Sequence, residues 1–209
     1  GDYFDYLPQP DGRLGIAVAD VSGKGVPAAL IMATFRAALR AQRVRGMPLD
    51  GIAERLNRIL LDSMDASRFV TAFYGLLDPA TGELGFANCG HNPPLLLRAA
   101  GGCDLLASGG PAMGMWRAAT FVSGAATVWP GDTLVLYTDG VVEIMNAAGE
   151  MFGVDRLEAV IRGRPRALSR ALVEAVVDAT RAFAGREGYE DDFTLVIIRR
   201  EGGAAGGAG

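Results

Sequence analysis

The order of apolar and polar positions predicts the elements of the first third of the chain. Residues 2–7 and 13–20 read as strands, and the turn sequence PQPDG between them predicts a hairpin. Apolar residues then recur at helical spacing from Pro27 to about residue 43, where proline suits a first helical turn. A second amphipathic stretch covers residues 49–64. This part of the chain therefore predicts a hairpin followed by two helices.

After the second helix the apolar period becomes mainly that of strands. Strands are predicted at 68–78, 84–90, 94–98, 119–129, 132–140 and 191–200, helices at about 153–162 and 167–184, and a glycine-rich irregular stretch at 99–117. Strands and helices do not alternate regularly, so the pattern favours an α+β fold of antiparallel sheets covered by helices over a doubly wound parallel sheet. We expect one domain over residues 1–200 and a flexible Gly/Ala tail over 201–209.

Composition and charge narrow the class of protein. Half of the residues are hydrophobic and 21% are charged, which is enough apolar material for a globular core. The net charge of −4 provides no basic field for nucleic acid or for an anionic membrane, and no apolar run is long enough to span a bilayer. Cys89 and Cys103 lack metal-ligand spacing and are interpreted as reduced core residues, which suits a cytoplasmic protein.

The stretch SGKG at residues 22–25 resembles a phosphate-binding loop only superficially. A P-loop requires Ser or Thr after the lysine and a glycine six positions before it, whereas this chain has Gly25 and Val18 at those positions. The sequence GKGVPA also matches a loose dinucleotide fingerprint. That fold needs a second parallel strand after one helix, but here two helices follow and the next strand begins near residue 69. Both interpretations are therefore disfavoured.

Aspartates recur at the ends of predicted strands. Asp20 and Asp139 each end a strand, Asp191 and its neighbour Asp192 open another, and Asp2 lies in the hairpin partner of the Asp20 strand. Carboxylates gathered at one edge repel one another, and hard cations such as Mg²⁺ or Mn²⁺ relieve that repulsion. A single histidine and two separated cysteines argue against zinc. Aspartate at a strand end is also common turn chemistry, so the residues alone leave both interpretations open.

Several longer motifs carry a family resemblance. They are GDYFD (1–5), ADVSGKGVPAALIMA (19–33), LNRIL (56–60), FVTAFYGLLDPATGEL (69–84), ANCGHNPPLLL (87–97), PGDTLVLYTDGVVE (130–143), FGVDRL (152–157) and DDFTLVI (191–197). In this order, over nearly the whole chain, they resemble the SpoIIE/RsbU branch of the PPM-type, metal-dependent serine/threonine phosphatases.

The resemblance implies a fold and a set of metal ligands. The implied fold is a four-layer α/β/β/α sandwich, in which helices flank two antiparallel sheets. Two Mn²⁺ or Mg²⁺ ions would be held by Asp2, Asp20, the Val21 carbonyl, Asp139 and Asp191. Asp20 would bridge both ions, and the resemblance assigns the catalytic role to Asp20 and Asp139.

The same resemblance implies an activity and its partners. A dimetal-activated water would hydrolyse a phosphoserine or phosphothreonine on a regulatory protein, such as an anti-anti-sigma factor with a STAS domain in a stress response. Sensor domains of the PAS, GAF or receiver type would lie elsewhere in the full-length protein, and a homodimer is compatible with this. The alternatives are a catalytically inactive module that binds such a partner and a small-molecule phosphoesterase.

The chain departs from the family pattern in two places. A further glycine and a strand usually precede GD, so the resemblance implies that the N-terminal strand is truncated here. The histidine that follows the bridging aspartate in eukaryotic relatives is replaced by Ser22. Asp191 is preferred over its neighbour Asp192 as the metal ligand, because the first residue of the pair aligns with the family's ligand.

Other polar residues allow more than one role. His91 is interpreted as a hydrogen-bonded turn residue or as a general acid, and Lys24 as a solvated loop lysine or as a phosphate contact. Glu143 and Asp5 are interpreted as capping or surface groups. Asn57, on the second helix, is expected to make a structural hydrogen bond to backbone.

Overall fold

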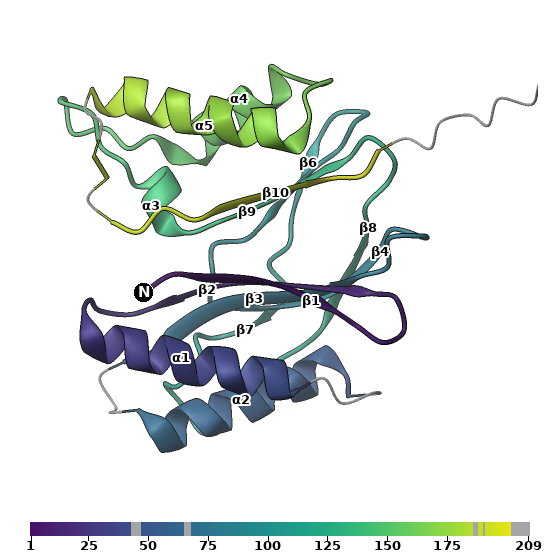
Figure 1. Cartoon of the computed structure of the whole chain (residues 1–209), viewed down its shortest axis with the longest axis vertical. Coiled ribbons are helices and arrows are strands. Elements are labelled where there is room, and N and C mark those ends of the chain that lie inside the picture. The colour runs from purple at the N-terminus through teal and green to yellow at the C-terminus, as the bar shows by residue number, and fades with distance from the viewer. Residues whose placement is uncertain (43–46, 65–67, 186–187, 190, 202–209) are drawn as a thin grey trace, which may run out of the picture. The chain divides into compact units, whose positions relative to one another are not determined.

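The computed structural model describes residues 1–42, 47–64, 68–185, 188–189 and 191–201 (Figure 1). The chain divides into two compact units. The first comprises Gly1–Pro93 and Leu106–Thr127, and the second Pro94–Leu105 and Val128–Gly209. Each unit consists of one β-sheet with helices packed on one of its faces.

The first unit contains a six-stranded sheet in the order β1-β2-β3-β4-β7, with β8 also paired to β4. The strands are β1 (Tyr3–Pro8), β2 (Leu14–Val21), β3 (Val70–Leu77), β4 (Glu83–Cys89), β7 (Gly109–Gly110) and β8 (Gly124–Thr127). The first four form an antiparallel meander, in which Tyr3 pairs with Ala19 and Asp20 pairs with Thr71. Short β7 runs parallel to β4.

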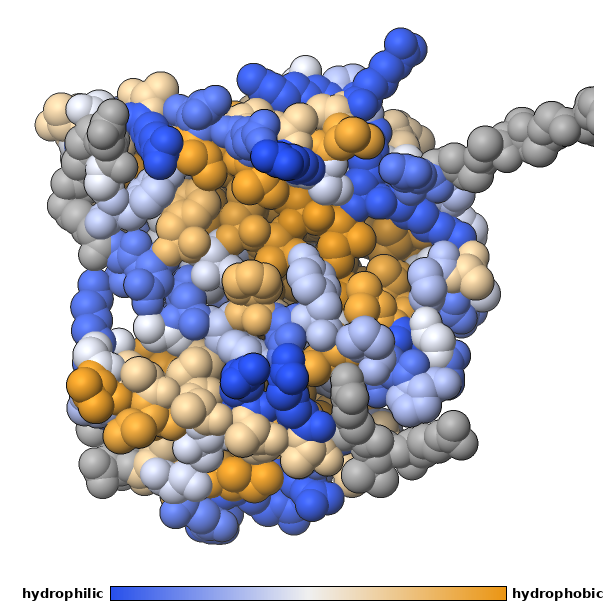
Figure 2. Space-filling model, viewed as in Figure 1, coloured by the Kyte–Doolittle hydropathy of each residue, from blue (hydrophilic) through white to orange (hydrophobic). Residues whose placement is uncertain are grey.

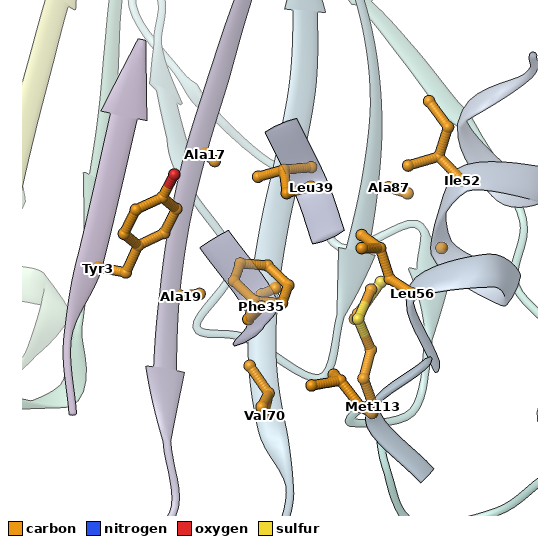
Figure 3. Close-up of a cluster of buried hydrophobic side chains, with 14 of the residues drawn as sticks. Tyr3, Ala17, Ala19, Phe35, Leu39, Ile52, Leu56, Val70, Ala87 and Met113 are labelled. Atoms are coloured by element: carbon orange, nitrogen blue, oxygen red, sulfur yellow. The ribbon is translucent and has the colours of Figure 1, made fainter. Parts of the chain in front are cut away.

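Two helices, α1 (Val26–Ala41) and α2 (Leu49–Ser63), cover one face of this sheet (Figure 1). The sheet contributes small side chains to the shared core, such as Ala17, Ala19 and Ala87, while the helices contribute large ones (Figure 3). Phe35 of α1 and Leu56 of α2 are each only 1% exposed. Alanines on the strands let the helices approach the sheet closely. Truncating the buried Phe35 to alanine would leave a cavity in this core and lower the free energy of unfolding by about 3–5 kcal/mol.

The second unit contains a four-stranded antiparallel sheet in the order β10-β9-β5-β6. Its strands are β5 (Leu95–Leu97), β6 (Cys103–Leu105), β9 (Thr133–Tyr137) and β10 (Leu195–Arg199), and its helices are α3 (Asp139–Val142), α4 (Gly153–Arg162) and α5 (Ser169–Ala184). Apolar residues of α4 and α5, among them Leu157 and Val176, pack with Val135 and Tyr137 of β9. The sheet and these two helices therefore share one core. Figure 1 shows the two helices along one face of the sheet.

The predicted fold class is confirmed as mixed α+β, with two mainly antiparallel sheets and flanking helices. The expectation of one domain over residues 1–200 stays a prediction, and residues 202–209 of the expected tail lie outside the described residues. Among the helices that the structure describes, none is long and apolar enough to cross a bilayer.

Some boundaries differ from the predictions. Asp139 does not end a strand but begins α3, because β9 stops at Tyr137. Residues 119–123 are not in a strand, and β8 covers only Gly124–Thr127. Asp191 and Asp192 precede β10, which begins at Leu195. The stretch 99–117, expected to be irregular, contributes β6 and β7, because pairing with neighbouring strands orders short segments that have no apolar period of their own.

Candidate functional site

The first group of predicted site residues lies at one end of the β1–β2 hairpin. Asp2 directly precedes Tyr3, which pairs with Ala19, and Asp20 directly follows Ala19. Both aspartates are half-buried, whereas the Val21 side chain is buried. A Cβ atom on Gly1 would lie 2.7 Å from Oδ1 of Asp20 and 3.0 Å from the Val21 carbonyl oxygen. The structure therefore brings the predicted ligands Asp2, Asp20 and Val21 into one small region.

The loop after Asp20 is held to the start of β3 by two hydrogen bonds through one residue. The Ser22 amide donates to the Phe69 carbonyl at 3.0 Å, and the Ser22 hydroxyl accepts from the Phe69 amide at 2.9 Å. Gly23 and Gly25 adopt φ values of 93° and 79°, which disfavour any residue with a side chain. The position that holds a histidine in eukaryotic relatives thus serves here to anchor the loop.

Arg68 is a cationic residue of this region that the sequence analysis missed. Its Nη1 donates to the Ser22 carbonyl at 3.3 Å, and a Cβ atom on Gly23 would lie 2.6 Å from the same nitrogen. The guanidinium group of Arg68 therefore lies against the loop that follows Asp20. Lys24, on the same loop, is exposed. The position of Arg68 could have been inferred from the antiparallel pairing of β2 with β3, because this pairing brings the residues before β3 to the loop after β2.

The second group of predicted site residues lies in the other unit. Asp139 begins α3 and accepts a hydrogen bond from the Gly140 amide at 2.8 Å, while Asp191 accepts one from the Asp192 amide at 3.0 Å. Gly140 also contacts the Asp192 carbonyl. Asp139 and Asp191, but not Asp192, line a pocket of about 220 Å³. The structure thus brings together two carboxylates that are far apart in the sequence.

Glu143 adds a third carboxylate to this pocket. The sequence predicted a capping or surface group at Glu143, and this residue is indeed exposed. The spacing of four residues between Asp139 and Glu143 could have indicated that the two carboxylates lie together, since residues one helical turn apart share a face. The Glu143 amide donates to the Asp139 carbonyl at 2.8 Å, which completes that turn. No basic side chain is among the described residues that line the pocket, so a bound cation would offset the acidic charge.

The donor set suits hard divalent cations. Carboxylate and carbonyl oxygens are the ligands that Mg²⁺ and Mn²⁺ prefer. Among the described residues, no three His, Cys, Asp or Glu side chains are placed so that they could hold a metal ion together.

The remaining residues of interest have defined partners. His91 is buried, its amide donates to Oδ1 of Asn88 at 2.8 Å, and its Nδ1 lies 3.1 Å from the Thr71 hydroxyl. The structural hydrogen bond expected of Asn57 is confirmed, because Nδ2 donates to the Trp116 carbonyl at 2.9 Å. Asp5 is not a simple surface group, since two nitrogens of Arg40 donate to its carboxylate.

Comparisons with known proteins agree with these observations. The family model described as Stage II sporulation protein E (SpoIIE) matches residues 10–201. Protein IcfG of Synechocystis sp. is 33% identical over 227 residues, which cover 96% of this chain and 36% of IcfG. The phosphoserine phosphatase RsbU of Bacillus subtilis is 29% identical over 203 residues, which cover 96% of this chain and 59% of RsbU. The chain therefore spans less than two thirds of the length of either relative.

Solved structures show the same fold. The RsbU and RsbW domains of Rv1364c from Mycobacterium tuberculosis superpose with a TM-score of 0.77 at 30% identity, covering 96% of this chain and 56% of that one. The SiaA-PP2C domain of Pseudomonas aeruginosa gives a TM-score of 0.81 at 25% identity, covering 96% and 80%. On the match of the family model to most of its length, this chain belongs to the SpoIIE family, the SpoIIE/RsbU type of PPM (PP2C-type) phosphatase domain.

Proposed function

We propose that this chain is a divalent-metal-dependent protein serine/threonine phosphatase domain. The observation that carries the proposal is the acidic pocket that Asp139 and Asp191 line together, although the two residues lie in separate segments of the sequence. Gathering carboxylates without a compensating basic group is unfavourable unless a cation binds there. A relative named as a phosphoserine phosphatase supports the reaction type.

The proposed ligands are Asp2, Asp20, the Val21 carbonyl, Asp139 and Asp191, which would together hold two Mn²⁺ or Mg²⁺ ions. When bound, such ions supply a water of lowered pKa and neutralise charge on a phosphoryl group. Asp20 and Asp139 are the residues to which we assign the catalytic role. The tied loop after Asp20 would keep its carboxylate in place, and Arg68 would attract the phosphate dianion of the substrate.

The surface beside the Asp20 loop supports a protein substrate. Val26 and Leu30, on the first turns of α1, are 72% and 65% exposed, and the surface over this end of α1 is apolar (Figure 2). Neighbouring exposed apolar side chains suit a protein surface better than a small phosphate ester. We propose a phosphorylated STAS-domain anti-anti-sigma protein as the substrate, as the family resemblance of the sequence motifs implies.

The setting of the domain is also part of the proposal. The matched relatives are longer than this chain, which is consistent with PAS, GAF or receiver sensor domains elsewhere in the full-length protein. We propose a cytoplasmic role in sigma-factor regulation and the stress response. A homodimer is compatible with that role.

A phosphate-release assay on a phosphoserine STAS protein tests the proposal. We expect hydrolysis that depends on Mn²⁺ and is lost in Asp20→Asn, Asp139→Asn and Asp191→Asn, while the matched control Asp178→Asn, on the exposed side of α5, is unaffected. Binding of the phosphoprotein without hydrolysis would instead identify an inactive partner-binding module. Turnover of p-nitrophenyl phosphate but not of the phosphoprotein would identify a small-molecule phosphoesterase.

A further inference from the structure

We propose that Thr71, held in place by His91, is a positioning residue for the Asp20 carboxylate. This inference rests on the proposed function, in which Asp20 binds metal. Asp20 of β2 and Thr71 of β3 are directly opposed partners in the antiparallel register. The Cβ atoms of such partners lie about 4.5–5.5 Å apart, so the two side chains are close neighbours across the strands.

The two side chains share one face of the sheet. Their neighbours along the strands, Ala19 and Val21 on β2 and Val70 on β3, belong to the core under α1 and α2. Side chains alternate along a strand, so Asp20 and Thr71 project from the opposite face. Both are half-buried, so water competes only partly for a hydrogen bond between them.

His91 fixes the Thr71 hydroxyl from the other side. Its Nδ1 lies 3.1 Å from the Thr71 hydroxyl oxygen, and its side chain is only 6% exposed. The His91 amide donates to Oδ1 of Asn88, and Nδ2 of Asn88 donates to the Leu106 carbonyl at 3.2 Å. Asn88 itself is 3% exposed. The backbone of His91 is therefore held by a buried network, and the Nδ1 atom of its ring lies against the Thr71 hydroxyl.

The proposed contact sets the direction of the hydrogen bonds among the three groups. An ionised carboxylate only accepts hydrogen bonds, so in this contact the Thr71 hydroxyl would donate its hydrogen to Asp20. The hydroxyl oxygen would then accept from His91, which requires a hydrogen on Nδ1. A ligand carboxylate that accepts such a bond is held in orientation, as is common around metal sites.

The test measures Mn²⁺ affinity of the purified chain by calorimetry, independently of turnover. Thr71→Val keeps the shape of the side chain and removes the hydroxyl, and we expect the Mn²⁺ Kd to rise about tenfold. Thr71→Ser keeps the hydroxyl and should retain most of the affinity. Thr34→Val on α1, whose hydroxyl donates to the Leu30 carbonyl, is the matched control and should bind Mn²⁺ normally. The KM for the phosphoprotein should stay unchanged in Thr71→Val, because Thr71 is assigned to positioning Asp20 and not to binding substrate.

A second pair of variants tests the part played by His91. Asn places an amide near the position of Nδ1, so His91→Asn should keep much of the affinity that His91→Phe loses. Because His91 acts through Thr71, adding His91→Phe to Thr71→Val should cause little further loss. Additive losses would instead indicate a separate structural role for His91 and would overturn its assignment.

Failure of the inference and failure of the proposed function give different results. If Asp20→Asn loses Mn²⁺ affinity while folded Thr71→Val and His91→Phe bind Mn²⁺ normally, the positioning role is overturned and the proposed function stands. If Asp20→Asn itself binds Mn²⁺ normally, both are overturned.

Discussion

Gly140, directly after Asp139, lies against the backbone carbonyl of Asp192 so closely that a Cβ atom there would overlap the oxygen. This contact joins the two segments that carry Asp139 and Asp191. The absence of a side chain at residue 140 is therefore a condition for the acidic pocket.

Gly140→Ala should force these two segments apart. We expect a loss of stability of about 1–3 kcal/mol, typical of overpacking, together with weaker Mn²⁺ binding. Gly188→Ala is the stability control, because that glycine lines the same pocket but has open space where its Cβ would lie. Chemical denaturation measures both variants, and equal stability of the two would contradict the prediction.

Arg68→Ala should raise the KM for the phosphoprotein about tenfold, since a charge-assisted hydrogen bond contributes roughly 1.5–3 kcal/mol before screening. The kcat should change little, because Arg68 is assigned to binding. Steady-state kinetics measure both parameters. Arg117→Ala is the control, because Arg117 belongs to the same unit and pairs with Asp62 at 2.6 Å on the surface. An unchanged KM in Arg68→Ala would show that the guanidinium serves only the loop.

The ion pair of Asp5 with Arg40 should make stability depend on pH. Arg40 donates to the Asp5 carboxylate at 2.7 and 2.9 Å, and the Tyr3 hydroxyl donates to it at 2.5 Å. Burial alone would raise the pKa of Asp5, but these hydrogen bonds outweigh it and lower the pKa below 3.8. Burial and the bond to Asp5 raise the pKa of Tyr3 to about 12, so Tyr3 stays a donor at neutral pH.

Because the pKa of Asp5 is lower in the folded state, its ionised form stabilises the fold above the unfolded value of about 3.9. That contribution is lost as the pH falls through the folded value. Thermal melts should therefore show Asp5→Asn to be less stable than wild type at pH 7, with the difference shrinking below about pH 4. A difference that stays constant down to pH 3 would refute this.

Asp132 should be a strong contributor to the stability of the second unit. It is 3% exposed, and its carboxylate accepts from Arg98 at 2.7 Å and from the amides of Ala99 and Trp129 at 2.9 and 3.0 Å. Asp132→Ala should cost about 3 kcal/mol in urea denaturation, because it removes the buried acceptor of two amides and of Arg98, whose pairing with Asp104 is more exposed. Asp104→Ala removes the other, more exposed partner of Arg98 and should cost much less. Similar losses for the two variants would contradict this account.

Asn57→Ala should destabilise the loop that follows Met113. The side chain is 1% exposed, and it bridges the Gly114 amide at 2.8 Å and the Trp116 carbonyl at 2.9 Å. Removing it leaves these two backbone groups without the Asn57 side chain as partner, which should lower the free energy of unfolding by about 2–3 kcal/mol. Hydrogen exchange should show the Gly114 amide exchanging faster, and protection equal to wild type would disprove the bridge. Asn57→Asp keeps the acceptor and loses the donor, so it should not restore stability.

The sequence alone was enough for features with a local cause. The amphipathic period over residues 153–162 predicted a helix, and α4 spans Gly153–Arg162. The turn sequence PQPDG predicted the hairpin that β1 and β2 form. In each case the information lies within a few residues of the feature.

Features made by contacts between distant residues could not be read in this way. Asp139 was expected to end a strand, but it is instead the first residue of α3. The two-residue strand β7 exists only because β4 lies beside it. Strand pairing could have placed Arg68 near the Asp20 loop, and helical spacing could have placed Glu143 near Asp139. Their roles still depend on which segments of the chain pack together.

The sequence by itself determined the order of the longer strands and helices, the α+β class and the aspartates worth testing, because periodicity and turn chemistry are local. Only the tertiary structure decided that Gly140 meets Asp192, that Arg40 holds Asp5 and that His91 lies behind Thr71. The reason is physical: these pairs form when whole sheets and helices pack, and such packing leaves no repeat in the sequence around either residue.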